Sequence, residues 1–525
     1  MSAFFPPGGG RAADAEQRPF VSRAWAWLRA DAPGTRDHVL TRELFLRLLG
    51  LVYLFAFWSL WPQILGLVGH DGILPARDYL TGVRAFTGAD RYWNVPTLAW
   101  LSASDGFLRF LCGGGILLSL LLVAGVLPGV TLALLWVFYL SLVTVGQDFL
   151  SYQWDALLLE TGFLAIFLAP ARVLPRRHAE APPSRLVLWL LRLLLFRLMF
   201  FSGVVKLASG DPAWRSLTAL AYHYHTQPIP TPLAWYADHL PMAVHEMSAA
   251  VMLMIELLVP WLIFGPRRLR HAAFVPFAAL QLGIAATGNY GSFNLLTIVL
   301  CTVLLDDLLL RRLTPARHRP RLRPTDALPA PHRFRRWVVV PVGAVILCVS
   351  AAESLEGFAP EGFVPRPVRR LEVLLYAPHI VNTYGLFAVM TTTRPEIVVE
   401  GSEDGRTWKT YEFRYKAGDV RRPPPWVAPH LPRLDWQMWF AALGGPGGAP
   451  WFESFVQRLL EGSPSVTGLL ARNPFPHRPP RYVRATLYDY RFTIPAEARR
   501  TGAWWTRREI GPYFPEATLG PASDE

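Results

Sequence analysis

The chain has 525 residues, of which 52% are hydrophobic and only 17% are charged. This composition, together with a positive mean hydropathy, is too apolar for a soluble enzyme of this size and predicts a protein that crosses the membrane several times. The net charge of +13 could indicate a nucleic-acid partner, but the arginines cluster in short segments between apolar runs, so we expect no nucleic acid.

The N-terminal segment is rich in Pro and Gly. Its first 20 residues, MSAFFPPGGGRAADAEQRPF, are largely polar and lack the apolar core of a secretory signal peptide. We therefore expect residues 1–42 to form a cytoplasmic segment, and the first membrane span to act as an uncleaved anchor.

Residues 43–352 contain the apolar runs and are predicted to form a helical transmembrane domain. A spanning helix needs about 20 mostly apolar residues. Nine candidate spans are present: Glu43–Leu67, Phe107–Val126, Val130–Val145, Asp155–Ala169, Leu186–Ala208, Met242–Phe264, Ala272–Thr287, Ser292–Leu310 and Val338–Ala352. The fourth run is short, which leaves a tilted or partly re-entrant course open.

The distribution of arginine predicts the orientation of these spans. Cytoplasmic loops of membrane proteins carry an excess of Lys and Arg. Arginine-rich loops at 172–177, 266–270 and 311–336 alternate with arginine-poor loops at 146–154 and 288–291. This alternation fits nine crossings with a cytoplasmic N-terminus, so residues 353–525 are expected to lie outside the cytoplasm.

The C-terminal region, 353–525, has a different pattern. Two strand-like runs within Glu396–Tyr415 flank a polar turn, which predicts a β-hairpin, and Tyr482–Thr493 is also rich in strand-forming residues. Leu434–Leu443 and Trp451–Leu460 are predicted to form short amphipathic helices. We expect an extracytoplasmic α+β domain, a β-sandwich with inserted helices, on the outer face of the membrane.

The three cysteines lie in apolar runs, at Cys112, Cys301 and Cys348. None lies in the C-terminal region, which argues against stabilising disulfides and a zinc–cysteine site. We interpret them as small buried hydrophobic residues and expect no cofactor.

Charged residues inside apolar runs are costly unless they are paired or hydrated. Five such residues are present: Asp155, Glu160, Arg192, Arg197 and Glu256. One interpretation pairs either glutamate with either arginine in an intramembrane polar network. The other places Asp155 near the outer surface as the partner of Lys206 across a polar pocket.

Lys206 is one of only three lysines and lies where the fifth apolar run meets a loop. It is either an anchor whose amine reaches the membrane surface or a functional amine. A lysine in apolar surroundings can act as a base, and Asp155 and His223 are then candidate assisting groups. His223 and His225, two residues apart, could share a strand face and bind a metal, or could simply form hydrogen bonds.

Many of the 20 tryptophans lie beside the ends of predicted spans, as an aromatic belt requires. Others lie in the C-terminal region, among them Trp426, Trp436, Trp439 and Trp451. These side chains could form the core of the outer domain. Alternatively, they form an apolar docking surface for the membrane or for a client protein.

Several longer motifs carry a family resemblance. They are Tyr152–Phe163, Gly210–Thr218, His223–Pro228, Trp235–Tyr236, Asn382–Phe387, Glu400–Trp408, Pro423–Trp426, Leu434–Leu443 and Asn473–Phe475. In these motifs, over about Leu44 to Phe514, the chain resembles the lipase maturation factors, polytopic membrane proteins of the animal endoplasmic reticulum with bacterial relatives. The resemblance implies assistance to the folding and assembly of a secreted lipase or other exported client, rather than lipid hydrolysis. The arginine-heavy composition and the lack of Asn-x-Ser/Thr sites suggest a bacterial source, with the protein in the inner membrane and its tail in the periplasm.

A shorter motif, Gly203–Leu207 followed by Trp214, resembles the membrane domain of the vitamin K-dependent γ-carboxylase superfamily. In those enzymes a lysine at this place is linked to catalysis. The resemblance implies an alternative function, a membrane enzyme that acts on a protein or a lipid-soluble substrate with Lys206 as base. A transporter is less well supported, because we find no inverted hydropathy repeat.

Overall fold

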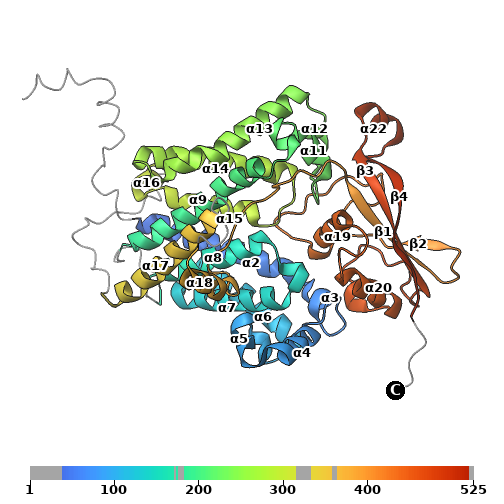
Figure 1. The fold of residues 1–525 in the computed structure, drawn as a ribbon, viewed down its shortest axis with the longest axis horizontal. Coiled ribbons are helices and arrows are strands. Elements are labelled where there is room, and N and C mark those ends of the chain that lie inside the picture. Colours follow the sequence, from blue (N-terminus) through green and yellow to red (C-terminus); the bar gives the residue numbers. More distant parts are fainter. Residues whose placement is uncertain (1–37, 171–172, 175–181, 315–332, 357–363, 520–525) are drawn as a thin grey trace, which may run out of the picture.

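The computed structural model describes residues 38–170, 173–174, 182–314, 333–356 and 364–519. A bundle of helices forms one part of the molecule, and a β-sheet lies at one end of it, with two helices between the sheet and the bundle (Figure 1). The predicted cytoplasmic segment 1–42 lies outside the described residues except for its last five positions.

The helices of the bundle follow the apolar runs closely. The longer ones are α2 (Val39–Leu60), α6 (Asp105–Ala124), α7 (Pro128–Val145), α8 (Gln153–Leu168), α9 (Arg185–Ala208), α13 (Met242–Leu257), α14 (Arg267–Thr287), α15 (Phe293–Cys301) and α17 (Arg333–Glu356). The shorter ones are α3 (Ile64–Val68), α4 (Ala76–Thr87), α5 (Arg91–Asn94), α10 (Pro212–Arg215), α11 (Ala219–Thr226), α12 (Pro232–Asp238), α16 (Asp307–Leu313) and α18 (Arg366–Tyr376).

Seven helices in the described part of the chain are long and apolar enough to cross a membrane. An eighth crossing results if the bent pair Phe293–Leu304 and Asp307–Leu313, which meet at 113°, is counted as one span. The predicted fourth run forms α8, whose 16 residues fall short of a full span. The bundle is therefore that of a polytopic membrane protein.

Helix α2 approaches α6 and α8 closely at two glycines. A Cβ atom on Gly115 of α6 would lie 2.4 Å from the ring of Phe57 in α2, and one on Gly162 of α8 would lie 1.9 Å from the Tyr53 hydroxyl. Larger residues at these two positions would push the helices apart. Small residues allow such close packing in membranes, where no hydrophobic effect drives the helices together.

The basic ends of the helices gather at one end of the bundle. The carboxylate of Asp307 caps α2 by accepting from the backbone N–H groups of Val39 (2.8 Å) and Thr41 (3.0 Å). The neighbouring Asp306 pairs with Arg267 at the start of α14. This end therefore carries the N-terminus of α2 and the arginines of α14, and it lies opposite the sheet (Figure 1).

The sheet has four antiparallel strands in the order β2-β1-β3-β4. They are β1 (Pro395–Ser402), β2 (Trp408–Thr410), β3 (Tyr482–Phe492) and β4 (Trp505–Ala517). The predicted hairpin and the strand near Tyr482 are present, whereas β4, which contains two prolines, has no clear strand signal in the sequence.

The predicted β-sandwich is wrong for the part of the chain that the structure describes, because a single sheet forms there. Helices α19 (Arg433–Gly444) and α20 (Trp451–Glu461), both predicted from the sequence, cover the inner face of the sheet. The buried side chains of Ile397, Val399 and Val483 pack into the same core as these helices. Apolar helix faces thus take the place of a second sheet.

The chain after α17 does not leave the bundle at once. Helix α18 packs against α17, and Asn382 forms buried hydrogen bonds with Glu160. The Asn382 carbonyl also accepts a hydrogen bond from Arg197. Arg197 is the thirteenth of the 24 residues of α9, so it lies about 18 Å along the helix axis from the start of α9. Residue 382 therefore lies near the middle of the bundle, before the chain reaches the sheet at Pro395.

Candidate functional site

The residues singled out in the sequence fall into separate polar clusters, most of them where the C-terminal region meets the bundle. Asp155, in the first turn of α8, is fully buried and forms an ion pair with Arg433 of α19. Its carboxylate oxygens lie 2.5 and 2.7 Å from the two terminal guanidinium nitrogens. The Tyr139 hydroxyl donates to the same carboxylate at 2.5 Å. This arrangement joins two residues 278 positions apart.

The prediction that Asp155 faces Lys206 is wrong, since Asp155 pairs with Arg433. Lys206 instead pairs with Glu256 of α13. Its amine donates to both Glu256 oxygens, at 2.9 and 2.8 Å, and to the Ser202 carbonyl at 3.0 Å. All three N–H donors of the ammonium are therefore used inside the bundle.

Glu160 and Arg197 form a second buried cluster. Arg197 donates to Glu160 at 2.8 Å, and its other terminal nitrogen lies 3.3 Å from Glu353 of α17. The second Glu160 oxygen accepts from the Tyr384 hydroxyl at 2.8 Å and from the backbone and side chain of Asn382 at 3.0 Å. The carboxylate is thus satisfied by the bundle and by the chain that follows it.

Arg192 does not join these glutamates. Its guanidinium donates twice, at 3.1 Å, to the backbone carbonyl of Val303. This carbonyl lies in η6 (Thr302–Leu304), just before the bend at residues 305–306. At a buried bend the last carbonyl groups of a helix lose their intrahelical donors and need other partners. Arg192 provides such a partner for the Val303 carbonyl.

His223 and His225 lie on helix α11 rather than on a strand. Residues two apart on a helix point in different directions, so the expected shared face does not form. The His225 Nδ1 atom lies 2.7 Å from Asp238, and His223 Nε2 lies 3.3 Å from the Tyr290 hydroxyl. Burial, with the nearby charge of Lys206, lowers the pKa of His223 to about 4, so the ring is neutral at pH 7. Across the described ranges, no three His, Cys, Asp or Glu side chains gather as metal ligands.

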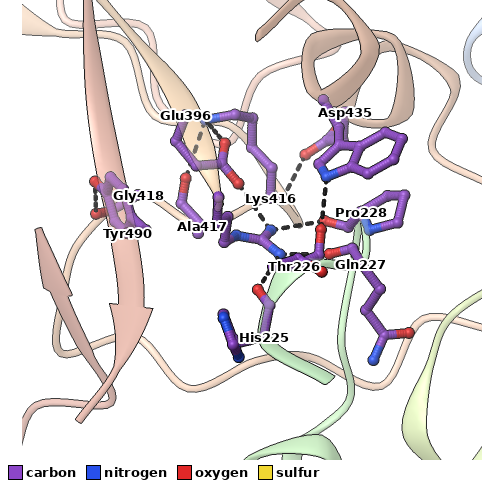
Figure 2. A network of polar contacts seen from close by, with 12 residues as sticks. His225, Thr226, Gln227, Pro228, Glu396, Lys416, Ala417, Gly418, Asp435 and Tyr490 are labelled. Atoms are coloured by element: carbon purple, nitrogen blue, oxygen red, sulfur yellow. Dashed lines mark hydrogen bonds and ion pairs between the residues drawn. The ribbon is translucent and has the colours of Figure 1, made fainter. Parts of the chain in front are cut away.

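A third buried cluster joins the sheet to the loop after α11 (Figure 2). Glu396 of β1 lies between Arg394 and Lys416, at 2.7 and 2.9 Å. Arg394 also donates to the carbonyls of His225 and Pro228, each at 2.8 Å. This cluster was not predicted from the sequence, although Arg394 and Lys416 are charged residues that flank the predicted hairpin.

Three of the four tryptophans proposed as a docking surface are buried. The ring of Trp436 meets that of Trp154 edge to face, with centroids 4.8 Å apart. The Trp439 indole N–H donates to the Thr226 carbonyl at 2.8 Å, and the Trp451 ring lies 5.4 Å from that of Phe149. These three side chains therefore bind the bundle and cannot meet a client, whereas Trp426 is 59% exposed.

Three of the polar clusters, around Asp155, Glu160 and Glu396, fix the C-terminal region to the bundle. Each cluster pairs an ionised side chain with its counter-charge or with backbone carbonyls, and most lie between elements far apart in the chain. Breaking one partner of such a pair is strongly destabilising. At these residues the geometry therefore joins the C-terminal region to the bundle through buried ion pairs and their hydrogen bonds.

Comparisons with known proteins cover both parts of the chain. Residues 40–312 match the family described as the lipase maturation factor transmembrane domain, and residues 380–515 match the lipase maturation factor C-terminal domain. Lipase maturation factor 2 of Homo sapiens is 40% identical over 92% of this chain and 83% of its own length. Lipase maturation factor 1 of Bos taurus is 36% identical over 97% of this chain and 92% of its own length. The comparison with solved structures gave no match.

Proposed function

This chain belongs to the lipase maturation factor family, and we propose that it is a membrane-bound factor that assists the folding and assembly of an exported lipase. The observation that carries the proposal is that similarity to the family extends through both the bundle and the sheet domain. The buried Asp155–Arg433 pair supports the view that the two parts act as one unit. The assistance expected is chaperone-like and needs no reaction at the polar clusters.

We place the sheet domain outside the cytoplasm, with nine crossings and a cytoplasmic N-terminus. The start of α14, whose first four residues include three arginines, lies at the end of the bundle opposite the sheet (Figure 1), and the positive-inside rule assigns such an end to the cytoplasm. Helices α8 and α15 are short, but most of their residues are buried by their neighbours, so they can cross with little lipid contact. For a bacterial chain, this orientation puts the sheet domain in the periplasm, where an exported client would fold.

Trp426 is the best candidate for contact with the client. Its side chain is exposed, while the backbone on either side of it is held by Asn289. The Asn289 side chain donates to the Pro425 carbonyl at 2.8 Å and accepts from the Val427 N–H at 2.8 Å. An exposed aromatic side chain on a fixed backbone loses little conformational entropy on binding, as is typical of interface hot spots.

The alternative of a γ-carboxylase-like enzyme receives no support from this arrangement. Its proposed base, Lys206, donates to Glu256 and to a backbone carbonyl, and its proposed helper Asp155 belongs to a different cluster. An ion pair between α9 and α13 accounts for the lysine without any reaction.

Co-expression with an exported lipase tests the proposal. Removing the factor should lower the activity per molecule of secreted lipase, and restoring it should recover that activity. Trp426→Ala should lower it by about tenfold or more, as expected for a hot-spot residue, at unchanged abundance of the factor. The matched control Ile510→Ala, at an exposed apolar residue of the same sheet domain, should have no effect.

The two parts of the proposal fail separately. If removal of the whole factor leaves every exported lipase of the cell fully active, the function is wrong. If removal matters but Trp426→Ala behaves like Ile510→Ala, the function stands and the client binds elsewhere.

A further inference from the structure

An exposed group of aromatic and apolar side chains lies between the first two long helices of the bundle, in the segment that contains α4, α5 and η3 (Leu98–Trp100). We call it the aromatic lip and define it as the exposed Phe86, Tyr92, Trp93 and Leu101 together with the half-buried Trp100. Phe86 is 91% exposed, Leu101 79% and Trp93 74%. Large apolar side chains exposed to this extent and grouped together indicate an interaction surface.

The depth of the lip in the bilayer follows from hydrogen bonds between the neighbouring residues 97 and 98 and helix α7. The Thr97 hydroxyl donates to the Ser141 carbonyl at 3.0 Å, and the Leu98 N–H donates to the Ser141 hydroxyl at 2.9 Å. Ser141 lies four residues, or about 6 Å, before the end of α7. Helix α7 has 18 residues and is therefore about 27 Å long, close to the thickness of the hydrocarbon core of a bilayer. The residues next to the lip thus lie at the outer edge of that core.

The lip also continues the surface of the bundle that faces lipid. Leu101 comes four residues before α6, and the exposed residues of α6 include Phe110, Leu117 and Leu120. Arg109, next to Phe110, is exposed as well. A charged side chain on a lipid-facing helix must reach the headgroups, so Arg109 marks the same boundary as Ser141.

We propose that the aromatic lip inserts into the outer leaflet, with its rings at the boundary between acyl chains and headgroups. Tyr and Trp favour this region of the bilayer because the rings are apolar and carry one polar group. The guanidinium of Arg91 lies 4.6 Å from the centre of the Tyr92 ring, which places a positive charge beside an aromatic ring, as at the headgroup boundary. The Trp100 indole N–H is already used by the Val95 carbonyl, at 2.9 Å. The partner of this surface is the lipid bilayer rather than a client, because the surface is continuous with the lipid face of α6.

Insertion of the lip would also set the height of the sheet domain above the bilayer. The chain directly before α4 is bonded to the helices that cover the sheet. Arg458 of α20 donates to the Gly72 carbonyl at 2.9 Å, and the Ser463 hydroxyl donates to the Asp71 carbonyl at 2.7 Å. Because only a few residues separate these contacts from α4, the depth of the lip in the outer leaflet would fix the height of α20 above the bilayer.

Spin-label accessibility in the full chain tests the proposal. The labels are placed at Phe86→Cys, Trp93→Cys and, as the matched control, Ile510→Cys on the solvent-facing side of β4. The background carries Cys348→Ser, since Cys348 is exposed and the other two cysteines are buried. The protein is reconstituted in vesicles of phosphatidylcholine and phosphatidylglycerol.

We expect labels at 86 and 93 to be several-fold more accessible to oxygen, and several-fold less accessible to a water-soluble nickel chelate, than the label at 510. Because Phe86 and Trp93 are highly exposed, neither substitution should disturb folding, and the two sites check each other. Equal nickel accessibility at all three sites would overturn the proposal. Protection of 86 and 93 only when an exported lipase is added would also overturn it and would assign the lip to the client.

Discussion

The substitution Arg433→Met tests whether the buried pair with Asp155 latches the sheet domain to the bundle. Arg433 is bonded to Asp155 through both terminal nitrogens, at 2.5 and 2.7 Å. Methionine keeps most of the apolar stem but leaves Asp155 buried with the Tyr139 hydroxyl as its main partner. Removing one member of a buried pair costs about 3–5 kcal/mol, which corresponds to a factor of about 10² to 10⁴ in the equilibrium for opening the latch.

Hydrogen exchange of the backbone around α19 measures this opening. The Leu431 N–H donates to Ser59 in α2 at 2.8 Å, and the Arg433 N–H donates to Gln63 at 2.8 Å. Both amides exchange only when the sheet domain separates from the bundle. In Arg433→Met, their protection should fall by about 100-fold or more.

Two further variants make this prediction specific. The double variant Asp155→Leu/Arg433→Met removes both charges and should regain most of the protection, because replacing a buried pair by apolar residues is often close to neutral. Arg484→Met breaks a partly exposed pair with Glu400 on the sheet and should change protection little. If Arg433→Met exchanges like Arg484→Met, or if the double variant is no better protected than the single, the pair is not a latch.

Two other predictions concern the remaining buried groups. Lys206→Met leaves Glu256 buried without its partner and should lower stability by about 3–5 kcal/mol, whereas Lys206→Met/Glu256→Leu should recover most of the melting temperature in detergent; equal losses in both variants would refute a structural ion pair. Burial, with the charges of Arg433 and Arg414, lowers the pKa of His430 from 6.5 to about 4. Between these pH values the unfolded chain binds a proton that the folded chain excludes, so stability falls as pH drops from about 6.5 to 4. His430→Gln should make the melting temperature less steeply dependent on pH in this window, and an unchanged slope would contradict the assignment.

The membrane bundle could be predicted from the sequence because its signals are local. A run such as Leu186–Ala208 must form a helix in lipid, since no water is available for its backbone groups. The proposed orientation of the spans rests on a signal that is also local, because the number of arginines in each loop can be counted from the sequence. The helices α19 and α20 and the hairpin of β1 and β2 were predicted equally well, from the spacing of apolar residues and from the turn between two strands.

Partners of the buried charges could not be predicted, because they come from distant parts of the chain. The sequence shows that Asp155 and Lys206 need counter-charges but not which ones. Their partners, Arg433 and Glu256, lie 278 and 50 residues away along the chain. The single sheet in place of a sandwich was also decided by tertiary packing, since α19 and α20 bury its inner face.

The exposure of the tryptophans shows the same division. Composition alone marks Trp426, Trp436, Trp439 and Trp451 as equivalent, since each is an apolar ring in a polar domain. Packing against the bundle buries three of them and leaves Trp426 exposed. The sequence by itself therefore determined a membrane bundle, a C-terminal region of different pattern, and the family, because apolar length and motifs are properties of short segments. Only the tertiary structure decided which charges pair and which rings stay accessible, because those outcomes depend on residues that meet only after folding.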